Sequence, residues 1–260
     1  MTSDEYTDGT ERICLDLFAG LGGFSSAFKD ADGWDVVTVD IEEDFDPDIC
    51  VDVLELQPDD LPDADVILAS PPCTDFSLAC MVQKWDIDDT RRPRYLPKWE
   101  SVATSIQIVF HTLWLVQELQ PDYWLMENPR WGALRQFIGE PAGTVHYCQY
   151  GSDFKKPTGL WGVHPPMDYR TCPGESCDHV SNPSELNTFR DGTRKAARLG
   201  DVVDSAERAK VPYELSKSIL EAVENPAPEQ QTLVEVADGR NDHSVELDTD
   251  HRDEWIADQL

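Results

Sequence analysis

One cysteine of the chain lies where its thiol could act as a nucleophile. Cys73 follows Pro71 and Pro72, which come directly after the apolar segment Asp65-Val-Ile-Leu-Ala-Ser70. That segment predicts a buried strand, and open α/β sheets bind ligands at the carboxyl ends of their strands. Because two prolines remove backbone donors and stiffen the turn, the next side chain is held in a fixed place. We therefore interpret Cys73 as a nucleophile, in contrast to three cysteines interpreted as packed thiols: Cys14, Cys50 and Cys80.

A carboxylic acid ends another predicted strand and could reach the same edge of the sheet. Glu127 closes the apolar segment that begins at Tyr123, and Asn128 and Pro129 follow it. A partly buried carboxylic acid there could hold a proton against a ring nitrogen of a substrate. The alternative is that Glu127 only caps a helix that begins after Pro129.

A glycine-rich turn follows the first predicted strand. Ala19-Gly-Leu-Gly-Gly23 lets the backbone approach a ligand closely and opens a helix N-terminus. Asp40 ends the next strand, where a carboxylate can accept both hydroxyls of a ribose. The dinucleotide fingerprint G-x-G-x-x-G is not met, because Ser25 stands in place of its third glycine. These residues indicate a nucleoside-bearing ligand, although methyltransferases, NAD proteins and plain tight turns share the pattern.

Short apolar strands that alternate with helices must position these residues. The predicted strands are 13–18, 35–40, 49–53, 65–70, 123–127 and 145–149. The predicted helices are 24–29, 101–118 and 205–223, the last broken by Pro212. We expect 71–99 and 150–200 to be irregular. The pattern favours βαβ units and a parallel sheet buried on both faces.

In this order the residues resemble the C5-cytosine-specific DNA methyltransferases, in a short, haloarchaeal or virus-like form. Asp16-Leu-Phe-Ala-Gly-Leu-Gly-Gly-Phe24 is similar to the first motif of that family, and Pro72-Cys-Thr-Asp-Phe-Ser77 to its proline–cysteine motif. Glu127-Asn128 resembles its Glu-Asn motif, and Val211-Pro212 more weakly its final motif. The resemblance implies an α/β, Rossmann-like S-adenosylmethionine-dependent methyltransferase fold. That fold has a mostly parallel sheet, helices on both faces and a small irregular C-terminal region.

The resemblance also implies roles for individual residues. Cys73 would add to C6 of a cytosine flipped out of double-stranded DNA, while Glu127 engages N3 and makes C5 carbanion-like. Pro72 and Asn128 complete the implied catalytic set. The residues implied to bind S-adenosyl-L-methionine are Asp16, Phe18, Ala19, Gly20, Gly22, Gly23, Asp40, Ile41, Asp52 and Pro71.

A local basic patch is the predicted contact with DNA. It comprises Arg91, Arg92, Arg94 and Lys98, with no acid between 91 and 99, and its alternative interpretation is a solvated loop. Ser77, Lys155 and Lys156 are further candidates for contact with DNA. The chain lacks the Gln-x-Arg-x-Arg motif of the family, and the two lysines stand in its place. Pro129 also departs from the family, which has valine there.

Five regions are expected along the chain. Residues 1–11 form a flexible start, 12–161 the catalytic domain, and 162–204 a short target-recognition region. Residues 205–224 form a helix that returns to the catalytic domain, and 225–260 a mobile acidic tail. Within the third region, Cys172, Cys177 and His179 resemble half of a zinc site, with Cys148 or His164 as a further ligand. The alternative is a turn with two free thiols, and the sequence leaves open whether a metal binds.

Charge and composition limit the classes of protein. The 260 residues carry 51 acidic and 21 basic side chains, a net charge of −30, and 40% are apolar, which excludes a fully disordered chain. Acids spread over the whole chain favour adaptation to molar salt, where a Debye length of about 3 Å still permits DNA binding. No apolar run approaches the roughly 18 residues of a membrane span. Seven scattered cysteines favour a reducing cytoplasm. Oligomeric state stays open, with a monomer as the simplest case.

Three other functions remain open at this point. A transfer-RNA cytosine-C5 methyltransferase would use the same catalytic groups. An amino-methyltransferase has a similar proline motif, but it needs an aromatic residue where this chain has Cys73. An inactive relative would keep the fold and only bind DNA or cofactor.

Overall fold

The computed structural model describes residues 11–88, 90, 95–179 and 209–226. Several predictions fall on other residues and therefore lie outside the described part: most of the 1–11 start, the patch residues Arg91, Arg92 and Arg94, the larger part of 162–204, and the tail beyond 226. In the described part, no helix has both the length and the apolar character that a membrane span needs.

The described strands form a mostly parallel sheet in the order β3-β2-β1-β4-β7-β9-β8. Their bounds are β1 Arg12–Leu17, β2 Trp34–Asp40, β3 Ile49–Cys50, β4 Val66–Ala69, β7 Tyr123–Pro129, β8 Gly143–His146 and β9 Pro157–Val163. All neighbours from β3 to β7 pair in parallel, whereas β9 is antiparallel to both β7 and β8. The strand order reverses direction between β1 and β4, which is the topological switch point where Rossmann-like sheets bind ligands.

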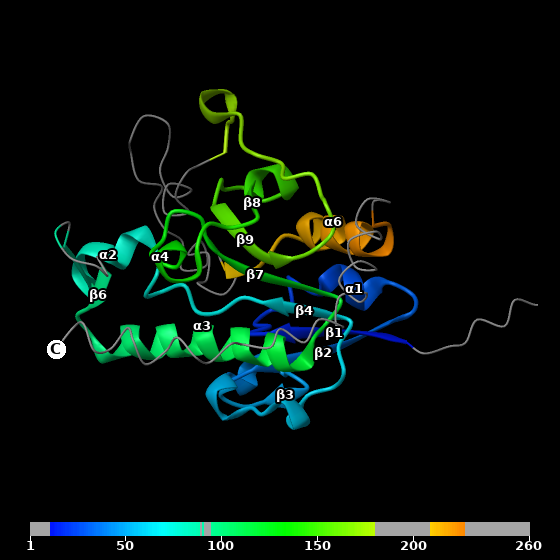
Figure 1. Ribbon diagram of the computed structural model, residues 1–260. Helices are drawn as coiled ribbons and strands as arrows, with labels where there is room; N and C mark the ends of the chain where they lie inside the picture. Colours follow the sequence, from blue (N-terminus) through cyan, green and yellow to red (C-terminus); the bar gives the residue numbers. More distant parts are fainter. Residues whose placement is uncertain (1–10, 89, 91–94, 180–208, 227–260) are drawn as a thin grey trace, which may run out of the picture. The chain divides into compact units, whose positions relative to one another are not determined.

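Helices cover both faces of the sheet (Figure 1). One face packs against α1 (Ser26–Asp30) and α6 (Tyr213–Glu224), where Cys14 of β1 meets Phe28 and Leu215. The other packs against α3 (Glu100–Leu119), where Leu15 meets Leu115. Two 3-10 turns, Val53–Glu55 and Pro58–Asp60, lie on the α3 side. Burial on both faces explains why the parallel strands have continuous apolar sequences, and the predicted Rossmann-like fold class is confirmed.

The structure contains elements that the sequence did not predict. The segment 71–99 holds α2 (Leu78–Lys84) and a two-stranded sheet of β5 (Trp85–Ile87) and β6 (Tyr95–Pro97). α4 (Arg135–Ile138) and 3-10 turns at Glu43–Phe45, Tyr147–Tyr150 (η4) and Gly174–Ser176 (η5) were also not predicted. β8 begins and ends earlier than predicted, because η4 takes up residues 147–150.

β9 was missed because its sequence has the composition of a loop. It begins with Pro157 and contains Gly159 and Gly162. Gly162 has a φ of +132°, and a Cβ there would lie 2.0 Å from the backbone oxygen of Trp124 on β7. Close approach of the neighbouring strand therefore requires glycine at this position.

The described part of the C-terminal region returns to the glycine-rich turn after β1. A Cβ on Gly23 would lie 2.5 Å from the backbone oxygen of Val211, so the two backbones touch. On α6, Ser216 Oγ donates to the Phe24 carbonyl oxygen at 2.6 Å and accepts from the Ala27 amide at 3.0 Å. Pro212 precedes the first turn of α6, which begins at Tyr213, as expected from the predicted break at Pro212. Residues 205–208 of the predicted helix lie outside the described part.

We predict that Ser216→Ala destabilises the protein by about 1–3 kcal/mol, because it leaves buried backbone groups of α1 without a partner. Urea denaturation in molar KCl would measure this loss. Lys217→Ala, on the exposed side of the same helix, is the matched control and should change the free energy of unfolding little. Equal effects of the two variants would contradict the role assigned to Ser216.

Candidate active site

Three segments meet at the switch point of the sheet: the turn after β1, the turn after β4 and the end of β7. These strands are neighbours in parallel register, with Leu17 opposite Ala69 and Ala69 opposite Met126. The glycine-rich turn and the Pro-Pro-Cys turn therefore begin at the same edge of the sheet as the Glu-Asn pair, which is still part of β7. This is the convergence that the sequence predicted.

The backbone on both sides of Cys73 is held by hydrogen bonds. The carbonyl oxygen of Pro71 accepts a bond of 2.9 Å from Asn128 Nδ2 on β7. The carbonyl oxygen of Cys73 accepts bonds from the amides of Phe76 at 3.1 Å and Ser77 at 2.9 Å. These bonds hold the backbone in a turn, and the Cys73 side chain is half-buried there.

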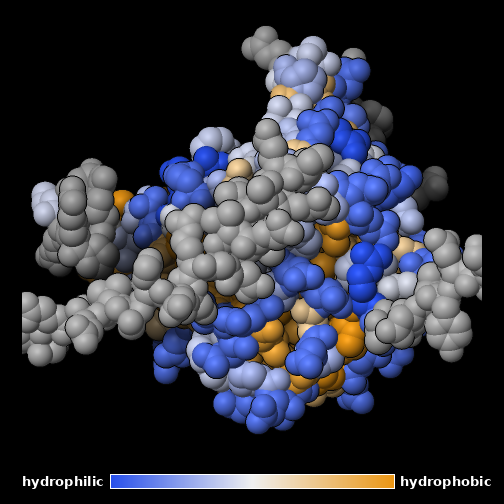
Figure 2. All heavy atoms as spheres, turned by 45° about the vertical axis from the view of Figure 1, so that its right-hand side comes forward, coloured by the Kyte–Doolittle hydropathy of each residue, from blue (hydrophilic) through white to orange (hydrophobic). Residues whose placement is uncertain are grey.

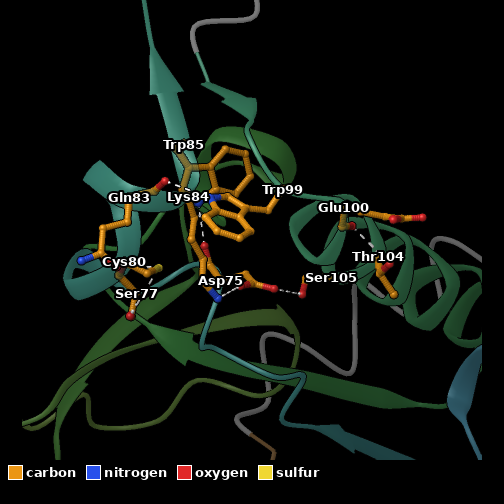
Figure 3. A network of polar contacts seen from close by, with 10 residues as sticks. All are labelled: Asp75, Ser77, Cys80, Gln83, Lys84, Trp85, Trp99, Glu100, Thr104 and Ser105. Carbon is orange, nitrogen blue, oxygen red and sulfur yellow. Dashed lines mark hydrogen bonds and ion pairs between the residues drawn. The ribbon is translucent and has the colours of Figure 1, made fainter.

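Asp75 anchors the same turn to two helices (Figure 3). Its buried carboxylate pairs with Lys84 of α2 and accepts a bond of 2.6 Å from Ser105 Oγ of α3. Its backbone oxygen accepts a bond of 2.6 Å from Trp85 Nε1. Sequence analysis assigned no role to Asp75, because its partners come together only when α2 and α3 pack.

A close backbone contact ties the turn to the loop after β7. The carbonyl oxygen of Phe76 accepts a bond of 2.7 Å from the Ala133 amide. A Cβ on Gly132 would lie 2.4 Å from that oxygen, so the approach requires glycine. The turn that carries Cys73 is therefore fixed relative to the loop that follows Glu127 and the rest of β7.

Glu127 is a buried carboxylate that contacts two side chains. No sequence motif predicted that either of them would lie beside Glu127. Tyr147, from η4, donates its hydroxyl to Glu127 Oε1 at 2.8 Å, and Lys156 Nζ lies 3.4 Å from the same oxygen. The ammonium of Lys156 also stands 4.3 Å from the centre of the Tyr147 ring. Lys156, predicted to contact nucleic acid, is thus placed beside Glu127 in the structure.

Charge and burial together set the protonation of Cys73. Burial raises the pKa of the Cys73 thiol, the charge of Glu127 raises it further, and Lys156 acts in the opposite direction. The pKa of the Tyr147 hydroxyl is likewise well above its ordinary value, through burial and Glu127. Cys73 is therefore a thiol at neutral pH, and loss of the negative charge beside it would take away one of the two causes that raise its pKa.

The turn after β1 leaves open space for a ligand. Phe18, Gly20 and Gly22 have positive φ angles of 64°, 51° and 66°, and a Cβ built on either glycine would meet nothing within 4 Å. Asp40 Oδ2 accepts a bond of 2.8 Å from the Gly20 amide, and its Oδ1 accepts one of 3.0 Å from Glu42. Asp40 therefore also shapes the turn. Beside it, Ile41 is exposed.

Two other carboxylates predicted to be at the cofactor site have structural partners. Asp52 Oδ1 caps a 3-10 turn by accepting from the Leu54 amide at 3.0 Å. Asp16 is fully buried under the turn, where Oδ2 accepts a bond of 2.6 Å from Ser25 Oγ and Oδ1 has no hydrogen-bond partner among the described residues. Burial raises the pKa of Asp16 to about 7.

The remaining candidates for DNA contact lie at the borders of this site. Ser77 precedes the first turn of α2. Lys98 Nζ donates to the Val82 carbonyl oxygen at 3.3 Å, and Lys155 Nζ to that of Gly174 at 3.2 Å. Sequence analysis missed Trp131, which directly follows the Glu-Asn segment, is half-exposed and is stacked on the Arg130 guanidinium at 4.6 Å.

We predict opposite shifts in the reactivity of Cys73 for two variants of its neighbours. Glu127→Gln removes the negative charge and should lower the pKa of the thiol, whereas Lys156→Met should raise it. The rate of Cys73 alkylation by iodoacetamide, followed against pH by mass spectrometry of its peptide, measures both shifts. If the alkylation profiles of both variants moved in the same direction along the pH axis, the opposite effects assigned to the charges of Glu127 and Lys156 would be wrong.

We also predict a pH-dependent role in stability for Asp75. Burial works to raise the pKa of Asp75, but the hydrogen bonds from Lys84 and Ser105 outweigh it and place the pKa below its ordinary value. Its stabilising effect is therefore present above the unfolded carboxyl pKa of about 3.9 and is lost as pH falls through the folded value. Asp75→Asn should lower the free energy of unfolding by about 2 kcal/mol at neutral pH.

The test is urea denaturation of wild type and Asp75→Asn from neutral to acidic pH. The difference between them should narrow as the wild-type carboxylate becomes protonated. Asp86→Asn, at an exposed position of β5, is the control and should change stability little. A difference that stays constant at every pH would show that the charge of Asp75 does not matter.

Comparisons with known proteins agree with this arrangement. The family model described as C-5 cytosine-specific DNA methylase matches residues 13–131, which contain all three segments. A Frog virus 3 protein named "Probable DNA (cytosine-5)-methyltransferase" is 33% identical over 180 residues, covering 65% of this chain and 80% of the viral one. "Type II methyltransferase M.XorII" of Xanthomonas oryzae pv. oryzae is 31% identical over 156 residues.

The bacterial relative is much longer than the matched part, since the match covers 50% of this chain and 32% of that one. Among solved structures, a candidate DNA modification methyltransferase encoded within an E. coli prophage has a TM-score of 0.41 and 21% identity, covering 69% of this chain and 56% of that one. The viral match extends over most of the viral protein. The chain therefore belongs to the C-5 cytosine-specific DNA methylases, the family of the DNA (cytosine-5)-methyltransferases.

Proposed function

We propose that this protein transfers a methyl group from S-adenosyl-L-methionine to C5 of a cytosine in DNA through a covalent adduct on Cys73. The observation that carries the proposal is the electrostatic coupling between the Cys73 thiol, in the turn after β4, and the buried carboxylate of Glu127, near the end of the adjacent strand β7. A base placed between these two groups would have a nucleophile at one side of its ring and an acid at the other.

The chemistry needs both groups. C5 of cytosine is a poor nucleophile in an aromatic ring, and addition of a thiolate at C6 turns it into an enamine-like carbon. The Cys73 sulfur forms the bond to C6 and gives up the thiol proton, and the displaced ring electrons move to N3. N3 takes up a proton that the Glu127 carboxyl group holds there, so that the net proton transfer is from the thiol to N3. After methyl transfer, loss of the C5 proton expels the Cys73 thiolate and restores the aromatic ring.

The coupling between the two groups offers a way to activate the thiol only when the base is present. In the free protein the charge on Glu127 raises the pKa of Cys73. When Glu127 shares a proton with N3, that charge is reduced and the pKa of the thiol falls. Tyr147 and Lys156 hold the carboxyl group in place during this change.

The open turn after β1 fits the cofactor. The cofactor supplies an electrophilic methyl group on a sulfonium. The turn Phe18–Gly23 would lie against it, because the glycines at positive φ leave room for a ligand. Asp40 would accept its ribose hydroxyls, since each carboxylate oxygen keeps a free lone pair beside the bond it already accepts. Ile41, Asp52, Ala19 and Pro71 would line the same space, above the buried carboxyl of Asp16.

DNA would be bound by local contacts, with the cytosine flipped out of the duplex. Lys98, Ser77 and Lys155 lie on loops and turns near the site. The patch residues Arg91, Arg92 and Arg94 would add positive charge to the same region of the sequence. Because 162–204 is short for target recognition, specificity for neighbouring bases is expected to be loose or to depend on a partner.

The direct test is transfer of labelled methyl groups in molar KCl to either duplex DNA or transfer RNA. Label recovered as 5-methylcytosine in DNA, and lost in Cys73→Ala, is the expected result. Cys50→Ser, at an exposed cysteine outside the site, is the control and should retain activity. Label on adenine, label confined to RNA, or undiminished activity of Cys73→Ala would each overturn the proposal.

We further propose that the acidic surface is an adaptation to high salt. The net charge is −30, and the face shown in Figure 2 is mostly hydrophilic. At about 0.1 M salt the Debye length is about 10 Å, so repulsion among carboxylates and between carboxylates and phosphates is poorly screened.

Methyl transfer and the free energy of unfolding should both fall steeply between molar KCl and about 0.1 M. Full activity at the lower concentration would refute this account of the charge.

A further inference from the structure

Three cysteines from two separate segments converge outside the proposed active site. Cys148 belongs to η4, whereas Cys172 and Cys177 flank η5 in the loop after β9. Their sulfur atoms all lie within 4.8 Å of one another, and Cys148 and Cys177 are 3.9 Å apart. Cys148 is buried and the other two are half-buried. None of these thiols has a part in the proposed methyl transfer.

The spacing of the sulfur atoms matches the edges of a tetrahedral metal site. Zinc binds thiolates at about 2.3 Å in tetrahedral geometry, which places neighbouring sulfurs about 3.8 Å apart. A disulfide needs its sulfurs about 2.05 Å apart and joins only two of them, so it would leave the third thiol of this cluster without a partner. Three converging thiols are therefore better explained by a metal than by a disulfide.

His179 is the candidate for the fourth ligand. Its Nδ1 lies 3.2 Å from the Cys177 sulfur, but it is not among the atoms that all lie within 4.8 Å of one another, so it would move toward the ion on binding. The other histidine considered from the sequence, His164, is engaged elsewhere. Its Nδ1 lies 2.9 Å from the Pro165 carbonyl oxygen, and its Nε2 lies 3.2 Å from the Tyr169 hydroxyl.

We propose that Cys148, Cys172, Cys177 and His179 bind one Zn²⁺ ion in a structural site. Four protein ligands leave no open position for water or substrate, which is the arrangement of structural rather than catalytic zinc. The ion would fasten the loop after β9 to η4. That loop already contacts η4, where the Tyr150 hydroxyl donates to the Asp168 carbonyl oxygen at 2.9 Å and Arg170 donates to the Gln149 carbonyl oxygen at 3.3 Å.

The proposed zinc site lies next to the residues that contact Glu127, so a bound ion would help to position this carboxylate. Tyr147, which donates to Glu127, directly precedes the ligand Cys148. Lys155 donates to Gly174, between the ligands Cys172 and Cys177, and the next residue is Lys156, the other partner of Glu127. Zinc would thus join the segment that carries Tyr147 to the loop that Lys155 contacts, one residue before Lys156.

Metal content of the full-length protein tests the proposal. The protein is purified with a phosphine reductant, incubated with Zn²⁺, desalted and analysed by plasma mass spectrometry. We expect one tightly held zinc per chain in wild type and in the Cys50→Ser control, and a loss of most of it in Cys172→Ser and His179→Ala. Zinc retained equally by all four proteins would assign it to surface carboxylates and overturn the proposal.

A spectroscopic measurement on wild type does not depend on whether the variants fold. Co²⁺ in a tetrahedral site with three thiolates absorbs strongly in the visible range, whereas Co²⁺ held by carboxylates and water absorbs weakly. The strong absorption should appear in wild type and disappear when Zn²⁺ is added. Absence of that absorption, or an intact mass lower by two hydrogens with no bound zinc, would show a free-thiol or disulfide state instead.

Discussion

The active site depends on the interaction between one buried negative charge and one thiol. Glu127 keeps its carboxylate in the interior because Tyr147 donates to it and Lys156 lies beside it. Burial of a charged group without such partners is costly. Burial and the charge of Glu127 together raise the pKa of the Cys73 thiol, and this charge is what a bound base is proposed to reduce, which links substrate binding to activation.

The fold supplies this interaction through strand order. Adjacent parallel strands end at one edge of the sheet, so the turn after β4 and the end of β7 are brought together by backbone pairing alone. The finer placement comes from supports behind the loops. Asn128 holds Pro71, Asp75 is held between α2 and α3, and Gly132 permits the close contact with Phe76. Each support limits movement of Cys73 without entering the reaction space.

The sequence could place Cys73, Glu127 and the glycine-rich turn at one edge, because each directly follows a continuous apolar segment. It could not place Tyr147 and Lys156 beside Glu127, because both come from the antiparallel β8–β9 part of the chain. There, proline and two glycines in β9 hide the strand pattern, although Gly162 is required by the approach of β7. Contacts such as Asp75 with Ser105 join residues 30 positions apart, and no local pattern records them.

The measurement that tests the central claim most directly is trapping of the covalent intermediate. DNA that contains 5-fluorocytosine cannot lose its C5 substituent as a proton, so the bond to sulfur should persist after methyl transfer. With S-adenosyl-L-methionine present, we predict an adduct that withstands denaturation and that peptide mapping assigns to Cys73. An adduct on another residue, or methylation of ordinary DNA with no trapped adduct at Cys73, would contradict the account.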